Sequence, residues 1–140
     1  GLILEKAKKK LAILQIEQGR PEQAQKILNQ VIEDNPRDNE ALYLRGNLFL
    51  DRRIAQNAIK DLRVVLKDVP NNVKTVLALA KAHVLRGEME LARQEFNRAI
   101  VINPNYIPAR VALAELFLRE GAFDKAQDVY LTGLKTSQCD

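Results

Sequence analysis

The chain has few of the residues that build chemical sites. It contains one cysteine, one histidine and no tryptophan among its 140 residues. A lone cysteine, Cys139, excludes a disulfide framework and indicates no redox compartment. One histidine and one cysteine do not supply the converging ligands of a zinc site, although a carboxylate cluster stays open as a source of metal ligands. The six glycines are isolated rather than clustered, which excludes a phosphate-binding glycine loop.

Long hydrophobic runs are missing as well. The longest stretch without a charged residue, 99–109, contains two prolines and is far too short to cross a bilayer. Residues 6–10 already carry four lysines inside a helical pattern, so we expect no signal peptide in this sequence. With so little targeting information, the cytoplasm and a bacterial periplasm or envelope both stay open as the location.

What the chain does contain is an internal repeat. Pro36, Pro70 and Pro104 lie 34 residues apart, in the phrases EDNPRD, KDVPNN and VINPNY. A period of this length indicates a stack of one supersecondary unit, in which each copy buries its apolar face against its neighbours. Placing the prolines at position 32 of the repeat divides the chain into four copies, 5–38, 39–72, 73–106 and 107–140.

Small residues recur at two positions of the repeat and glycine at a third. Small side chains let two helices approach closely, and glycine suits the left-handed turn that ends a helix. Position 8 holds Ala12, Gly46, Ala80 and Ala114, and position 20 holds Ala24, Ala58, Ala92 and Ala126. Position 15 holds Gly19, Gly87 and Gly121, with Arg53 as the exception.

Apolar stripes of helical period lie on both sides of each turn. Leu4, Ala7, Leu11 and Leu14 form one such stripe. Proline at position 32 cannot continue a helix, and no segment shows the alternation of a half-buried strand. We therefore predict an all-α fold with eight helices, near 2–18, 21–34, 39–52, 55–68, 73–86, 89–102, 107–120 and 123–136.

Taken together, these columns resemble the tetratricopeptide repeat, a helix–turn–helix of about 34 residues. The resemblance covers 5–140 and implies one domain over 1–140, a right-handed α–α superhelix of eight antiparallel helices. The sequence departs from the family pattern at Lys8, Gln15, Arg45 and Arg110. The runs LRGNLFLDRR and ALAELFLREGAFDKAQ are similar in style to bacterial envelope members of the family that accompany exopolysaccharide export and exosortase sorting.

The two ends of the sequence give a further expectation. The helical pattern begins at Leu2, and the fourth copy is followed by no polar helix that would cover it. Stacked repeats normally carry such covering helices. We therefore expect the sequence to be an excerpt of a longer protein.

The resemblance also implies a binding groove along the first helix of each repeat. Two columns of this groove are largely apolar, and Asn47 offers an amide that can pair with both the N–H and the C=O of a bound backbone. An amphipathic helix or an extended segment would suit such a track, although the same side chains could instead pack on their neighbours. The candidate groove residues are Lys9, Ile13, Tyr43, Asn47, Leu50, Leu77, Lys81, Val84, Val111, Glu115 and Leu118.

One well-known partner of this family does not fit. Members that bind the acidic C-termini of heat-shock chaperones hold the terminal carboxylate with lysine, asparagine and arginine at set positions of three repeats. Lys9 and Lys74 match that pattern, but Ile13, Leu44 and Ala78 do not. A chaperone co-factor is therefore disfavoured.

Nucleic-acid binding and catalysis are disfavoured on similar grounds. The chain has a net charge of +4, but its densest lysine cluster, within 6–10, runs around a helix rather than along one face. The seven aromatic residues fall mostly in packing columns and are poorly placed to stack bases. His83 shares its column with Phe49 and Phe117, so we expect a packed histidine rather than a catalytic base.

The sequence thus predicts a scaffold without enzymatic activity or cofactor, which binds a peptide or protein of unknown identity in its groove. Two alternatives stay open: an accessory or assembly region of a larger enzyme or envelope complex, and a self-association module. Tyr130, Leu131 and Leu134 form an apolar strip near the end of the last predicted helix. Since an uncovered strip tends to find a partner, we expect weak self-association through 123–136.

Overall fold

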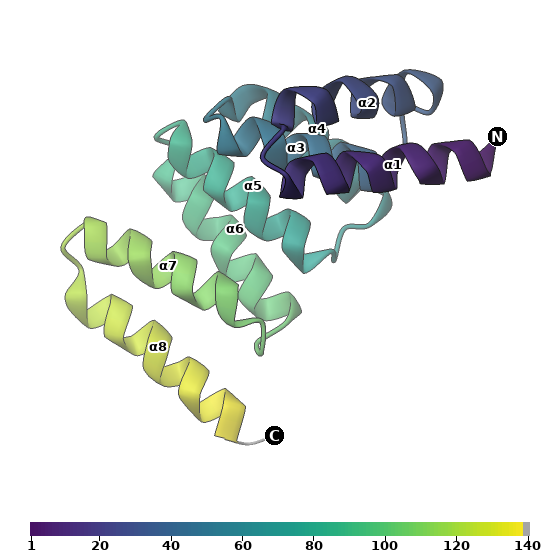
Figure 1. Ribbon diagram of the computed structural model, residues 1–140. Helices are drawn as coiled ribbons and strands as arrows, with labels where there is room; N and C mark the ends of the chain where they lie inside the picture. The colour runs from purple at the N-terminus through teal and green to yellow at the C-terminus, as the bar shows by residue number, and fades with distance from the viewer. Residues whose placement is uncertain (139–140) are drawn as a thin grey trace. The chain divides into compact units, whose positions relative to one another are not determined.

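The computed structural model describes residues 1–138, and within them it contains eight α-helices and no strand (Figure 1). The all-α class is therefore confirmed, and the predicted helix boundaries hold to within about two residues. The helices are α1 (Leu2–Glu17), α2 (Pro21–Asp34), α3 (Asn39–Asp51), α4 (Ala55–Asp68), α5 (Val73–Leu85), α6 (Met89–Ile102), α7 (Ile107–Arg119) and α8 (Phe123–Gln138).

The helices form two compact units that divide after Pro70. In the first unit, α1 packs on α2, α2 on α3 and α3 on α4, and α1 also touches α3. In the second unit, α5 packs on α6, α6 on α7 and α7 on α8. Each unit thus contains two helix–turn–helix repeats, and within each unit the second helix of the first repeat packs on the first helix of the second repeat.

A left-handed residue ends the first helix of every repeat. Gly19, Gly87 and Gly121 have φ of 73°, 76° and 75°. Arg53, the exception in the glycine column, adopts the same conformation with φ of 64°. Its N–H donates to the carbonyl of Leu50 at 2.9 Å, and the next N–H donates to Phe49 at 2.8 Å. The turn after α3 therefore has the same helix-ending geometry as the other three turns, although it has arginine where they have the glycine that favours this geometry.

The second helices end just before the recurring prolines. Asn35, Val69 and Asn103 leave the helix with φ of −139°, −131° and −143°. Each stands directly before a proline, whose ring disfavours a helical conformation in the preceding residue. The proline column thus sets the position at which each repeat turns.

Small residues occupy the close helix contacts, as predicted. Ala24, Ala58 and Ala92 are fully buried. A Cβ added to Gly46 on α3 would lie 3.0 Å from Cδ2 of Leu62 on α4, so this glycine marks a close approach of two helices. The small-residue columns therefore have the packing role that their recurrence predicts.

One departure from the repeat pattern, Arg110, fits against a glycine of the facing helix. Arg110 is buried, and its Nε donates to the carbonyl of Pro104 at 3.1 Å. Its Cδ would lie only 2.7 Å from a Cβ added to Gly133 on α8. The arginine on α7 thus fills the space that the glycine leaves and finds a backbone acceptor for its buried guanidinium.

Candidate functional site

The candidate groove residues of the first unit lie on α1 and α3, and all of them are half-buried. Tyr43, Asn47 and Leu50 are spaced i, i+4, i+7, which places them on one face of α3. Lys9 is already engaged, because its Nζ lies 3.0 Å from Oδ2 of Asp38. That carboxylate also caps α3, since it accepts from the N–H of Ala41. In the first unit, therefore, α3 offers the groove face, whereas Lys9 holds two helices together.

The candidate residues of the second unit differ in how much surface they offer. Lys81 on α5 and Glu115 on α7 are exposed. The first helix of the third repeat therefore presents a positive charge, and that of the fourth repeat a negative charge. Leu118 is exposed, and Val84 and Val111 are half-buried; all three give apolar surface beside those charges. Leu77 is buried and contributes little.

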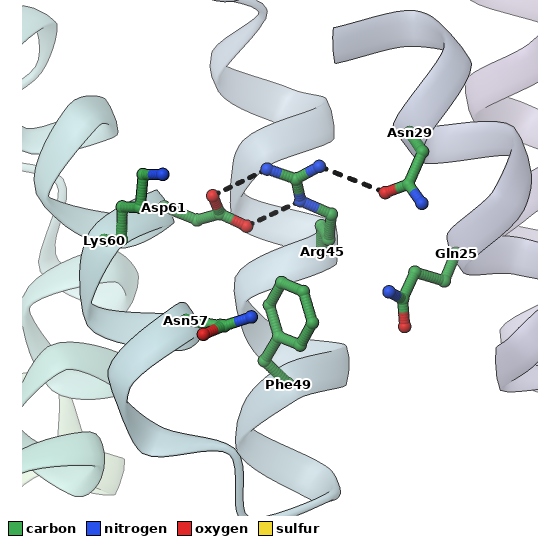
Figure 2. A pocket seen from close by; sticks show the side chains of 7 residues that line it. All are labelled: Gln25, Asn29, Arg45, Phe49, Asn57, Lys60 and Asp61. Atoms are coloured by element: carbon green, nitrogen blue, oxygen red, sulfur yellow. Dashed lines mark hydrogen bonds and ion pairs between the residues drawn. The ribbon is translucent and has the colours of Figure 1, made fainter. Parts of the chain in front are cut away.

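A polar pocket lies on the other face of α3, and the sequence did not predict it. Its lining side chains come from α2, α3 and α4 and surround a hollow of about 310 Å³. Figure 2 shows these side chains from close by. Because Arg45 and Phe49 are spaced i, i+4 and lie about half a turn from Tyr43, the pocket and the candidate groove face opposite directions from α3. The lining residues are Gln25, Asn29, Arg45, Phe49, Asn57, Lys60 and Asp61.

An arginine at the centre of the pocket joins all three helices (Figure 2). The guanidinium of Arg45 donates from Nε and Nη2 to the two carboxylate oxygens of Asp61 on α4, at 2.7 and 2.8 Å. Its Nη1 donates to Asn29 on α2 at 3.0 Å. Its Cζ lies 5.7 Å from the centre of the Phe49 ring. Such a two-pronged pair is strong and directional, so it fixes how α3 sits between its neighbours.

The edge of the pocket carries a second polar link between repeats. Arg52, at the end of α3, donates to Gln25 at 2.8 Å and pairs with Glu22 at 2.8 Å. The pKa of the Glu22 carboxyl is lowered, first by a hydrogen bond from its own backbone and then by the hydrogen bond from Arg52. The carboxylate is therefore ionised at neutral pH and keeps its ion pair.

None of these groups forms a catalytic arrangement. Asp61 is buried and occupied by Arg45, so it is held as an ion-pair partner rather than facing a substrate. His83 is buried on α5 with its Nδ1 3.0 Å from Oε1 of Glu88, which is the packed histidine expected from its column. Among residues 1–138, no cluster of histidine, cysteine and carboxylate side chains is arranged to hold a metal. Nor does any helix in that range combine the length and apolarity needed to cross a bilayer.

The sequence did contain one signal for the pocket. Arg45 stands where the repeat pattern has a leucine-like residue. A charged residue in a packing column requires a partner, and Asp61, in the second helix of the same repeat, is that partner.

Comparison with known proteins agrees with the repeat assignment. The family described as "Tetratricopeptide repeat" matches residues 9–73 and 58–107. Human tetratricopeptide repeat protein 21B is 30% identical over 67 residues, which are 48% of this chain and 5% of the human protein. The chain therefore spans only a small part of the length of that relative.

Solved structures show the same fold. A MamA crystal structure is 20% identical with a TM-score of 0.84 and covers 96% of this chain and 78% of its own. MamA from Desulfovibrio magneticus RS-1 is 16% identical with a TM-score of 0.87 (97% and 77% covered). TTC0263, a thermophilic TPR protein of Thermus thermophilus, is 22% identical with a TM-score of 0.81 (94% and 73%).

Proposed function

The chain belongs to the tetratricopeptide repeat family, and from that premise we propose that it binds a peptide or an extended segment of a partner protein along its first helices. The family is one of protein-interaction repeats, which supports a scaffold without enzymatic activity. The observation that carries the finer proposal is the pattern of exposure on α3. Leu42, Leu48 and Phe49 are buried, whereas Tyr43, Asn47 and Leu50 keep part of their surface open.

The chemistry of this face suits a peptide backbone. The Asn47 side chain can donate to a backbone carbonyl and accept from a backbone N–H of the ligand. Tyr43 and Leu50 stand one turn to either side of it and offer apolar area. Aromatic anchors of this kind carry much of the energy of protein interfaces. We propose that Tyr43 and Asn47 are the principal anchors of the first unit.

The second unit by itself offers charge selection. The exposed Lys81 on α5 and Glu115 on α7 each lie in the candidate groove column of their helix. A ligand that carries an acidic and a basic side chain would pair with both, and such rim charges affect association rate and specificity more than affinity. We therefore propose a ligand of mixed charge rather than a purely acidic one.

Affinity capture followed by titration of the captured partner tests the proposal. Tyr43→Ala and Asn47→Ala should each weaken binding by about tenfold, equivalent to about 1.4 kcal/mol, while the circular dichroism spectrum stays unchanged. Lys60→Glu is the matched control, because this exposed side chain lines the pocket on the opposite face of α3. A loss of binding with Lys60→Glu and not with the α3 variants would assign the working surface to the pocket instead.

A further inference from the structure

The polar pocket between α2, α3 and α4 has charged residues where other repeats are apolar. Arg45, which donates to both carboxylate oxygens of Asp61, has leucine at its repeat position in the other three copies. The fourth copy has Leu113 and Val129 at the two positions of this pair. Apolar residues thus suffice there for helices of this fold to pack, and a buried ion pair is not needed for stability. The pair gives the pocket a chemistry that the repeat does not require.

The amides that line the pocket present hydrogen-bond donors. The side-chain oxygen of Gln25 accepts from Arg52 at 2.8 Å, and that of Asn29 accepts from Arg45 at 3.0 Å. Because an arginine holds the oxygen of each amide, the NH2 group of each is the end that a ligand would meet. Asn57 adds a third amide to the lining. The pocket is therefore suited to a ligand that accepts hydrogen bonds.

The charges of the pocket leave one positive charge uncompensated. Arg45 pairs with Asp61, and Arg52 at the edge pairs with Glu22. Lys60 also lines the pocket and is exposed, and in Figure 2 no dashed line joins it to another of the side chains drawn. A lysine beside several donors attracts an anion whose oxygens accept hydrogen bonds.

A carboxylate matches this charge better than a phosphate does. A carboxylate has one negative charge at neutral pH, whereas a phosphate ester has about 1.5 to 2. Among the lining residues that the structure describes, Lys60 is the one cation outside the Arg45–Asp61 pair. The second charge of a phosphate would therefore face the buried carboxylate of Asp61 without a cation of its own.

The size and openness of the pocket indicate what carries the carboxylate. A hollow of about 310 Å³ lies at the lower end of the range for ligand sites, so it accommodates one side chain rather than a folded segment. Asn29, Asn57 and Lys60 are exposed, so the rest of a bound chain can stay outside the pocket. Phe49 lines the pocket as well and offers a small apolar area to the methylene groups of a glutamate.

We propose that this pocket binds a glutamate side chain of a protein, with Lys60 as the counter-charge and the three amides as donors to the carboxylate. The pair of Arg45 with Asp61 has a positioning role, because Arg45 orients the amide of Asn29. The pocket and the candidate groove face opposite directions from α3, so the ligand of the pocket is not the segment proposed for the groove. The two proposals therefore fail independently.

An NMR titration of the isotope-labelled chain with N-acetylglutamate N-methylamide, a capped glutamate, tests the proposal. The side-chain NH2 signals of Gln25, Asn29 and Asn57 should shift and saturate with a Kd of about 1–10 mM. The neutral N-acetylglutamine N-methylamide should leave these signals in place. Lys60→Gln should weaken the binding of the capped glutamate by about threefold, as expected for an exposed charge pair.

The matched control is Lys26→Gln. Lys26 is exposed at the repeat position of Lys60, but on α2 and outside the lining. This variant loses the same charge from the chain and should bind the capped glutamate as the unmodified chain does. Equal affinity of Lys60→Gln and Lys26→Gln would refute the role of the pocket lysine.

A double variant tests the positioning role of the ion pair. Arg45→Leu with Asp61→Val introduces the residues of the fourth copy, so the circular dichroism spectrum should stay unchanged while the affinity for the capped glutamate falls by about tenfold. If this variant loses helicity, Asn57→Ala at an exposed site takes its place and should weaken binding by about threefold.

The other probes decide which ligand the pocket takes. Signals that never saturate, or that respond equally to capped glutamine, overturn the proposal of a carboxylate site. Acetate that binds as tightly as the capped glutamate overturns it in favour of a free small carboxylate. Inorganic phosphate that binds more tightly than the capped glutamate overturns it in favour of a phosphate ligand.

Discussion

Replacing Arg53 by glycine should stabilise the protein. Arg53 holds a left-handed conformation, with φ of 64°, at the turn between α3 and α4. Three of the four equivalent positions have glycine there with nearly the same φ. The side chain of Arg53 is exposed, and its neighbour Arg52 makes the ion pair with Glu22. Removing this side chain therefore gives up no interaction that the turn depends on.

The size of the effect follows from two opposing terms. A side chain in the left-handed region costs roughly 1–2 kcal/mol, and glycine costs roughly 0.5–1 kcal/mol more than other residues to order on folding. The net gain for Arg53→Gly is therefore about 0.5–1 kcal/mol, which corresponds to about 2–4 °C in Tm for a chain of this size. Urea titration followed by circular dichroism would measure the free energy of unfolding directly.

Two further variants decide whether the turn conformation is the cause. Arg53→Ala removes the same charge but keeps a Cβ in the left-handed region, so it should change stability by less than about 0.5 kcal/mol. Gly87→Ala is the reverse change in the second unit, where a Cβ would meet no atom within 4 Å, and it should destabilise by about 1 kcal/mol. If Arg53→Gly proves no more stable than Arg53→Ala, the reasoning from the left-handed turn is wrong.

The remaining predictions concern packing and the buried ion pair. Ala92 is fully buried, so Ala92→Leu should overpack the helix contact and lower the free energy of unfolding by about 1–3 kcal/mol. Gln94→Leu, at an exposed site, should stay within about 0.5 kcal/mol, and equal urea midpoints for the two would contradict the repeat frame. Asp61→Asn should cost about 1–3 kcal/mol, because it leaves the partly buried guanidinium of Arg45 without its counter-charge; an unchanged midpoint would show that solvent replaces the carboxylate.

The sequence was enough to predict the backbone of each repeat. Glycine and proline act through local backbone geometry, so Gly19 and Pro36 determine where helices end without reference to the rest of the chain. The close helix contacts could be predicted as well, because all four copies have small residues at the same repeat positions. Arg53 was only an exception in the glycine column, because its residue type argues against a left-handed conformation; the structure shows that it adopts one all the same.

The side-chain partners could not be predicted in the same way. Lys9 falls in a groove column, yet its partner Asp38 stands at the start of α3, in the next repeat, and only the packed structure brings the two within 3.0 Å. Arg110 departs from the pattern of its column, and its fit against Gly133 appears only when α7 and α8 are side by side. The four copies carry different residues at these positions, so comparing one copy with another does not reveal which side chains pair.

These individual pairs also explain how the order of the repeats is specified. The apolar columns are nearly the same in every copy and would allow several stackings. The polar links differ: α2 presents Gln25 and Glu22 to Arg52 of the following helix, whereas α6 presents Arg93, at the repeat position of Gln25, to Glu120. Stacking α3 on α6 would bring Arg52 toward Arg93 but also toward Glu90, which stands at the repeat position of Glu22. Stacking α7 on α2 would place Glu120 beside Glu22 and Gln25, without its cation Arg93. Each exposed pair contributes little stability, but Glu120 has its cation only on α6, so the charges favour placing α7 after α6 rather than after α2.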